Sequence, residues 1–208
     1  MTKPFYKTIA HDAHAELVEK KSRFIAAVRP VTTEEQALEF IAAMRSKYYD
    51  ASHNVYAYII GVNNIMRYSD DGEPSGTAGI PALEVLKKEE LIDVAVVVTR
   101  YFGGTMLGAG GLIRAYGSSA KLGIDAGGIV VRTLCDVVHI KADYSLLGKI
   151  QYELLSADYI ISEILYEAEI TVIAHCKVEQ TQAMIAMICD VTNARALCET
   201  VDCIYIDL

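Results

Sequence analysis

The sequence of 208 residues contains no uninterrupted apolar run near the roughly 20 residues that a membrane-spanning helix needs. Its first residues, 1–7, also lack the apolar segment of a secretory signal peptide. These absences argue against a membrane partner, and they predict a cytoplasmic protein.

The cysteines have neither the even number of a disulfide framework nor the CxxC spacing of a metal or redox site. Cys198 and Cys203 are an odd number of positions apart, which places them on opposite faces of a continuous strand. We therefore expect no metal and no other cofactor, and reduced thiols that are buried as small apolar side chains. The five cysteines are Cys135, Cys176, Cys189, Cys198 and Cys203.

Basic character is also missing, because the net charge is −8. Proteins that bind nucleic acid mainly through charge present a strongly basic face. We therefore exclude a reader of DNA sequence, while a local basic groove for RNA stays open. With 52% hydrophobic and 22% charged residues, the chain can form one large domain or two small ones.

The phosphate-binding signatures of nucleotide enzymes are absent too. Gly108 and Gly110 begin a G-x-G-x-x-G pattern, but Ile113 stands where the third glycine is needed. No Gly-Lys-Ser or Gly-Lys-Thr of a Walker loop precedes a predicted helix. The sequence thus disfavours a standard dinucleotide or nucleoside triphosphate site.

What the sequence does contain is two glycine-rich loops, each of which follows an apolar run and precedes a helical pattern. The first lies within residues 68–81 and the second within residues 96–114. Glycine lets a backbone adopt positive φ and approach a ligand closely, at an entropic cost, and such loops usually bind something. We therefore place the function of the chain at these loops.

The second loop has the composition of an anion-binding site. It precedes a helix predicted over about 111–125, so its backbone N–H groups meet the positive end of the helix dipole. Arg100 and Arg114 flank the loop and could bind a phosphate or carboxylate. From Val94 to Ile124 the chain carries Arg100, Arg114 and Lys121 but no acidic side chain, which predicts a local positive field from these three cations. The predicted anion-binding residues are Arg100, Gly103, Gly104, Gly108, Gly110, Gly111 and Arg114, with Ser75 and Thr77 from the first loop. The alternative is that these glycines serve only close packing of the helix on the sheet. Gly117, within the apolar stripe of the helix, is expected to permit close packing.

The first loop carries three carboxylates, Asp70, Asp71 and Glu73, as weak candidates for a metal site or for acid–base chemistry. Short acidic residues beside glycine and proline are ordinary turn formers, and that interpretation is favoured here. His53, at the mouth of a predicted strand, is expected to form hydrogen bonds, and no catalytic group is assigned. Tyr68 and Tyr101 flank the loops, where they could stack on bases or pack beneath the backbone.

The order of predicted elements indicates an α+β protein with two two-layer α/β sandwich domains, over residues 1–134 and 135–208. The second half shows the order strand, helix, strand, strand, helix, strand, which is the ferredoxin-like βαββαβ arrangement. Its strands are predicted over 137–142, 159–165, 170–178 and 201–206.

Five stretches of the chain resemble the YigZ/IMPACT family of bacterial two-domain type. They are residues 19–26, 53–58, 68–79, 97–104 and 107–116. The resemblance implies an N-terminal domain with a fold found in several ribosomal proteins and translational GTPases, and a C-terminal ferredoxin-like domain. It also implies a link to the regulation of translation, but it brings no established catalytic residue.

Three functions follow from these observations. The favoured one is a non-enzymatic, translation-linked protein that binds RNA, the ribosome or a translation-associated protein through the second loop. The alternatives are a metal-assisted enzyme for a phosphorylated small molecule and a pure protein-interaction module. Steep weakening of binding by salt would distinguish RNA binding from a compact enzyme site.

Overall fold

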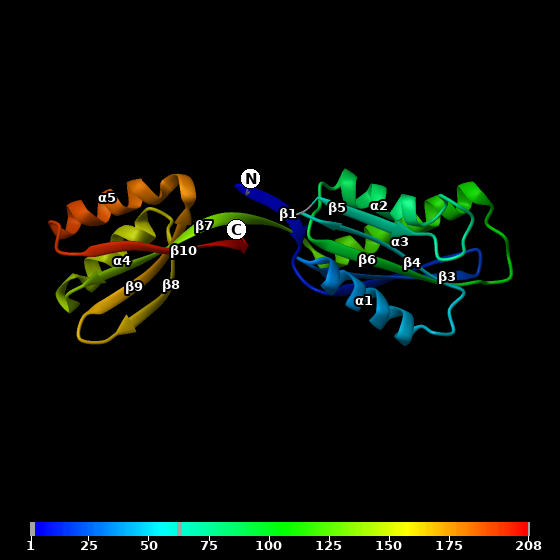
Figure 1. The fold of residues 1–208 in the computed structure, drawn as a ribbon, viewed down its shortest axis with the longest axis horizontal. Coiled ribbons are helices and arrows are strands. Elements are labelled where there is room, and N and C mark those ends of the chain that lie inside the picture. The colour runs from blue at the N-terminus through cyan, green and yellow to red at the C-terminus, as the bar shows by residue number, and fades with distance from the viewer. Residues whose placement is uncertain (1–2, 62–63, 208) are drawn as a thin grey trace. The chain divides into compact units, whose positions relative to one another are not determined.

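The computed structural model of the chain describes residues 3–61 and 64–207. The chain divides into two compact units, which are residues 6–131 and residues 132–207 together with 3–5. We call them the N-terminal and the C-terminal domain; each is described by itself (Figure 1). The strand β7 (Ile129–Ala142) is continuous across the predicted boundary at 134/135, and the position of that boundary stays a prediction.

The N-terminal domain is built on a five-stranded sheet in which all neighbouring strands are antiparallel. Its order is β2 (Ala13–Glu19), β3 (Ser22–Pro30), β6 (Val94–Tyr101), β4 (His53–Ile60) and β5 (Ile65–Ser69). The central strand β6 is buried on both faces, as its unbroken apolar sequence predicts. Near the end of β6, the strand register places Arg100 opposite Phe24 of β3 and opposite His53 of β4. These three residues therefore lie beside the loops.

Helices cover both faces of this sheet (Figure 1). Helices α2 (Gly79–Lys88) and α3 (Ala109–Gly127) pack on the face that Val94, Val96 and Val98 share, as a two-layer sandwich predicts. Helix α1 (Glu34–Lys47) adds a layer on the opposite face, against Ala95 and Val97. The alternating side chains of one apolar strand therefore fill two separate cores.

Close packing of α3 on the sheet depends on Gly123 and Gly127, and not on Gly117 as the sequence predicts. A Cβ atom at Gly123 would lie 3.0 Å from Ala26 Cβ, and one at Gly127 would lie 3.1 Å from Val28 Cγ2. A Cβ atom at Gly117 would meet nothing within 4 Å. The prediction that Gly117 allows close packing is therefore wrong, because the buried stripe of α3 is displaced from it by a residue or two.

The C-terminal domain confirms the predicted βαββαβ order. After β7 follow α4 (Leu147–Ser156), β8 (Ile160–Tyr166), β9 (Ile170–Lys177), α5 (Thr181–Thr192) and β10 (Leu197–Asp207). The antiparallel sheet has the order β8, β9, β7, β10, and β1 (Phe5–Ile9) also pairs with β7. Single 3-10 turns, Tyr144–Leu146 and Val178–Gln180, precede the helices α4 and α5. The βαββαβ order with this antiparallel pairing is the ferredoxin-like arrangement.

The cysteines are free thiols, but not all of them are core residues. Cys135 and Cys176 are buried, Cys198 is half-buried, and Cys189 and Cys203 are exposed. The prediction of burial is therefore wrong for Cys189 and Cys203, because β10 and the outer side of α5 are exposed there. None of the helices within the described residues is long and apolar enough to cross a membrane.

Candidate functional site

The two glycine-rich loops meet at the end of β6, where a buried carboxylate connects them. Glu73 of the first loop accepts a hydrogen bond from Arg100 Nη1 at 2.6 Å and another from the Tyr116 hydroxyl at 2.8 Å. Arg100 ends the central strand, and Tyr116 lies in α3 after the second loop. One carboxylate thus joins three separate segments of the N-terminal domain.

Arg100 is held from several directions in this cluster. Its guanidinium lies 5.4 Å from the ring centroids of both Phe24 and Phe102, and Nη2 donates to Ser22 Oγ at 3.3 Å. The side chains of Arg100 and Glu73 are only 6% and 4% exposed. Breaking such a buried pair by removing one partner leaves an uncompensated charge, so the pair supports the fold of both loops.

Tyr116 completes the cluster as a hydrogen-bond donor. Its ring is buried and packs edge-on against Phe24, with 5.2 Å between the ring centroids. Burial of the hydroxyl, together with the neighbouring negative charge of Glu73, raises the pKa of Tyr116. The hydroxyl therefore stays protonated at neutral pH and donates to Glu73.

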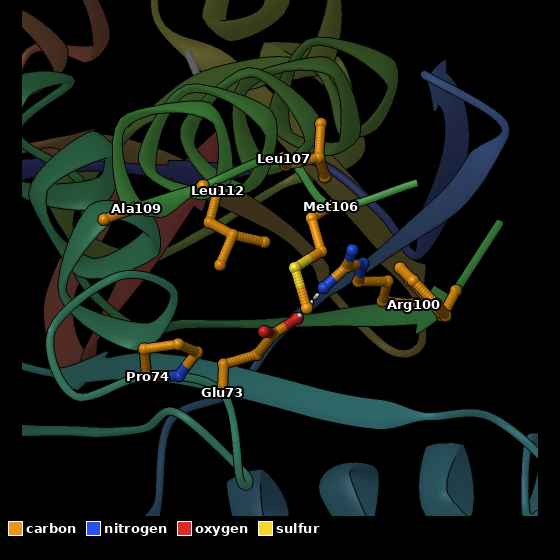
Figure 2. A pocket seen from close by; sticks show the side chains of 9 residues that line it. Glu73, Pro74, Arg100, Met106, Leu107, Ala109 and Leu112 are labelled. Atoms are coloured by element: carbon orange, nitrogen blue, oxygen red, sulfur yellow. Dashed lines mark hydrogen bonds and ion pairs between the residues drawn. The ribbon is translucent and has the colours of Figure 1, made fainter. Parts of the chain in front are cut away.

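A pocket of about 280 Å³ opens beside this cluster (Figure 2). Glu73 and Arg100 supply its polar groups, while the other lining side chains are apolar. The remaining lining residues are Pro74, Phe102, Met106, Leu107, Gly108, Ala109 and Leu112. Met106 is 87% exposed, so it lies at the rim, whereas Leu112 is buried. An apolar pocket with a few polar groups has the composition of a ligand site.

The carboxylates of the first loop do not converge on one point. Asp70 accepts hydrogen bonds from the backbone N–H groups of Gly76, Ala78 and Gly79, at 2.8, 3.1 and 2.8 Å. It therefore occupies the N-terminus of α2 as an internal anion. Asp71 instead accepts from Asn54 N at 2.6 Å and from Arg45 at 2.7 Å.

Because Asp70, Asp71 and Glu73 each face a different partner, the structure does not bring the three weak metal candidates together. Within 3–61 and 64–207, no cluster of three or more His, Cys, Asp or Glu side chains has the arrangement of a metal site. Turn formation and helix capping account for Asp70 and Asp71, as the favoured interpretation of the sequence expected.

The second loop leaves the N-terminus of α3 open. The residue before the helix is Gly108, which has φ of 72° and no side chain to cap it, and the first helical bond runs from Leu112 N to Gly108 O. The N–H groups of Ala109, Gly110 and Gly111 have no acceptor in the described part of the chain. Free backbone N–H groups at a helix start are the donors that anions bind in many proteins.

The cations near this loop differ in their availability. Arg100 is paired with Glu73, and Lys121 is paired with Glu89 and Asp125. The prediction of a positive field from all three cations is therefore wrong for these two. Arg114 is exposed, has no ion-pair or hydrogen-bond partner among the described residues, and lies along the first turn of α3 near Gly110.

The predicted glycines divide into two groups. A Cβ atom at Gly103 would lie 2.0 Å from the backbone carbonyl of Lys21, so this position serves the close approach of the second loop to the turn between β2 and β3. Gly104 and Gly108 have positive φ and open space around the missing Cβ, and Gly110 is exposed. Gly111 would place a Cβ 3.0 Å from Leu107 Cβ.

The other predicted residues mostly support the loops. His53 Nδ1 lies 2.8 Å from Asp71 O, and the phenol of Tyr101 donates to Asp50 at 2.7 Å, which raises the pKa of Tyr101. The Thr77 hydroxyl donates to Pro74 O at 2.7 Å, while Ser75 is exposed. Tyr68 is 45% exposed on β5, outside the lining of the pocket.

Sequence reasoning missed the apolar walls of the pocket and the role of Tyr116. Met106, Leu107 and Leu112 carry no polar group, and the sequence offered no reason to separate them from other core residues. Tyr116 did carry a signal, because a buried tyrosine in an apolar helix stripe needs a partner for its hydroxyl. Glu73 is the acceptor that the first loop provides.

Comparisons with known proteins agree with this architecture. Residues 20–124 match the Impact N-terminal domain, and residues 140–195 match a domain of unknown function, DUF1949. The chain is thus a two-domain α+β protein whose loop site lies in an Impact-type domain. It belongs to the IMPACT family.

Several relatives support this assignment. The chain is 45% identical to the IMPACT family member YvyE of Bacillus subtilis, over 92% of this chain and 88% of that protein. It is 33% identical to the IMPACT family member YigZ of Escherichia coli, over 67% of this chain and 74% of the relative. A crystal structure of a hypothetical protein superposes with a TM-score of 0.63 at 26% identity, covering 97% of this chain and 99% of that one.

Proposed function

We propose that this chain is a non-enzymatic, cytoplasmic, translation-linked regulatory protein that binds its partner at the second glycine loop. The link to translation rests on the resemblance of the loops to the YigZ/IMPACT family, to which the chain belongs. The mode of binding rests on the loop itself, where an anionic group of the partner meets the first turn of α3.

The observation that carries this proposal is the open N-terminus of α3. Helix α2 begins in the same kind of loop, but the carboxylate of Asp70 already occupies its N-terminus. Among the residues that the structure describes, helix α3 has free N–H groups at Ala109, Gly110 and Gly111, and the unpaired Arg114 lies beside them. A carboxylate or phosphate from another molecule would take the place that Asp70 takes on α2.

Among the partners considered, the charges favour a protein over RNA. Binding to a nucleic acid backbone depends on several cations that neutralise successive phosphates. At this loop Arg100 and Lys121 are already neutralised by acidic neighbours, which leaves Arg114 to face the partner. A single carboxylate of a protein suits this arrangement better than a run of phosphates. The metal-assisted enzyme loses its support, since its three carboxylates face different partners.

Affinity capture from a cell lysate with the full-length chain tests this proposal. We expect partner proteins of the translation apparatus to be retained after nuclease treatment, and to be lost when Arg114→Glu introduces a negative charge. Lys149→Glu, at an exposed position of α4, is a matched charge reversal that should leave capture unchanged. Retention that disappears with nuclease, or that survives Arg114→Glu, would contradict it.

A further inference from the structure

The pocket beside α3 combines three chemical features in one place. The start of α3 lines it at Gly108 and Ala109, apolar side chains form its walls, and Glu73 and Arg100 lie at the far side. Figure 2 shows Ala109 and Arg100 on opposite sides of the pocket, with Leu112 between them. A ligand that fills the pocket therefore meets the helix start, an apolar wall and the buried ion pair together.

The polar side of the pocket retains unused hydrogen-bonding capacity. Arg100 Nε is buried and has no hydrogen-bond partner in the described part of the chain, although the residue as a whole is 5% exposed. Glu73 Oε1 accepts from both Arg100 and Tyr116, while its other oxygen, Oε2, has no partner within the described residues. Leaving a buried donor unpaired costs free energy, which a ligand with an acceptor would recover.

The size of the pocket restricts the ligand. Pockets that enclose drug-sized molecules measure about 300–1,000 Å³, so one of about 280 Å³ is near the lower limit. A volume near that limit suits one large side chain with its backbone. The apolar walls formed by Phe102, Met106 and Leu112 require that this side chain be apolar.

We infer that the pocket binds the C-terminal residue of a partner polypeptide, with the α-carboxylate at the start of α3 and an apolar side chain between Met106 and Leu112. A chain-terminal residue carries a carboxylate and an apolar side chain on the same Cα, whereas an internal Asp or Glu has its carboxylate in place of the apolar group. Its peptide group adds an N–H donor for Glu73 Oε2 and a C=O acceptor for Arg100 Nε, the two atoms that have no hydrogen-bond partner among the described residues. Capture of a terminal carboxylate by free backbone N–H groups is a known mode of peptide recognition.

This inference rests on the proposed function, because it names the group that the partner presents at the same loop. The free apolar amino acid shares the carboxylate and the side chain, but it has an ammonium group where a peptide has its N–H and C=O. Probes can therefore separate a polypeptide C-terminus from a metabolite.

The test is a titration of the ¹⁵N-labelled full-length protein with N-acetyl-Gly-Leu as the free acid, at millimolar concentrations. We expect saturable shifts of the amide signals of Gly108 to Leu112. The C-terminal amide of the same peptide should bind about tenfold or more weakly, because the charge-assisted hydrogen bonds are lost. Free leucine and a single-stranded RNA of eight uridines should give weaker, unsaturated shifts.

Two substitutions of helical glycines provide the matched control. Gly110→Glu places a carboxylate on the first turn of α3, so it should abolish binding of the free acid. Gly117→Glu introduces the same side chain about two turns further along α3, where an added Cβ meets nothing within 4 Å, and it should retain binding within about threefold because the charge is about a Debye length away.

Equal binding of the free acid and the amide, equal loss in the Gly110→Glu and Gly117→Glu variants, or tighter binding of free leucine or RNA would overturn the inference. If the peptide fails while lysate capture still depends on Arg114, only the terminal-residue inference falls. If capture is also independent of Arg114, the proposed function falls with it.

Discussion

The two glycine-rich loops resemble each other in sequence, but they differ in what binds the backbone N–H groups at the N-terminus of the helix that follows. The first loop supplies its own anion, because Asp70 bonds to three backbone N–H groups at the start of α2. The second loop supplies none, and the start of α3 stays open beside Arg114 and an apolar pocket. The difference is thus one acidic residue. A loop whose own carboxylate binds the helix N-terminus closes itself, whereas a loop without one leaves the N–H groups available to a partner.

The loops also depend on each other. Glu73, from the loop that closes itself, holds Arg100 and Tyr116 on both sides of the open loop. In the proposed function, the first loop therefore acts as a support, and the second as the binding surface. This division can be tested by substitutions that affect stability alone, and by others that affect binding alone.

The largest expected effect comes from the shared support. Glu73→Ala leaves Arg100 as a buried charge without its partner, which should lower the free energy of unfolding by about 3–5 kcal/mol. Chemical denaturation of the full-length protein measures this loss. A double variant, Glu73→Leu with Arg100→Met, should recover most of the stability, because neither charge is then left alone. A mild effect of Glu73→Ala would show that the ion pair does not support the loops.

Gly103→Ala should also destabilise the protein strongly. The added Cβ would lie 2.0 Å from the carbonyl of Lys21, so the backbone of one loop must move, at a cost of about 3 kcal/mol. Gly104→Ala is the matched control: it has open space for a Cβ, so only its positive φ of 81° is unfavourable. Comparable losses in both variants would mean that the close approach at Gly103 is not required.

Asp70→Ala should lower the free energy of unfolding by about 2 kcal/mol, because it removes the acceptor at the N-terminus of α2. The measurement is the midpoint of urea unfolding, at constant denaturant slope. Binding of a partner at the second loop should be unchanged in the remaining folded protein. If Asp70→Ala instead abolished binding without loss of stability, the assignment of the two loops would be reversed.

Gly110→Glu should have the smallest effect on stability, and of opposite sign. It replaces a helical glycine and adds a favourable charge at the start of α3, so the protein should be stabilised by about 1 kcal/mol. Gly117→Ala, where the added Cβ meets open space, should stabilise α3 by a similar amount without affecting partner binding. Thermal unfolding of both variants, combined with lysate capture, separates stability from binding. Binding by Gly110→Glu equal to that of the unchanged protein would contradict an anion site.

Much of the fold could be predicted because it depends on local sequence patterns. The apolar strand β6, the glycine loop after it and the helix α3 appear in the sequence in that order, and so does the βαββαβ order of the C-terminal domain. The helix start of α1 shows the limit of such patterns. Its cap is Thr33, which accepts from Gln36 N, although Thr32 with Glu35 has the same spacing in the sequence.

The candidate site could be predicted only in part. The position of the loops follows from glycine content, and Arg100 lies before the second loop, near the end of β6. Its pairing with Glu73, 27 residues away, depends on how the first loop crosses the end of the sheet. No spacing rule relates two residues on different loops, because their distance is set by strand order and register.

The sequence by itself determined which segments form strands, helices and glycine-rich loops, because the spacing of hydrophobic residues and the glycine content influence the backbone over a few neighbouring residues. It also determined that the two loops would hold the polar and charged groups of the site. Only the tertiary structure decided which of these groups remain available. Asp71 and Arg100 pair with charged residues 26 and 27 positions away, and Asp70 is held by backbone N–H groups at the start of α2. Within the described residues, the start of α3 and Arg114 have no such partners. The physical reason is that charge compensation depends on distances in space, which the packing of both loops against one strand end establishes.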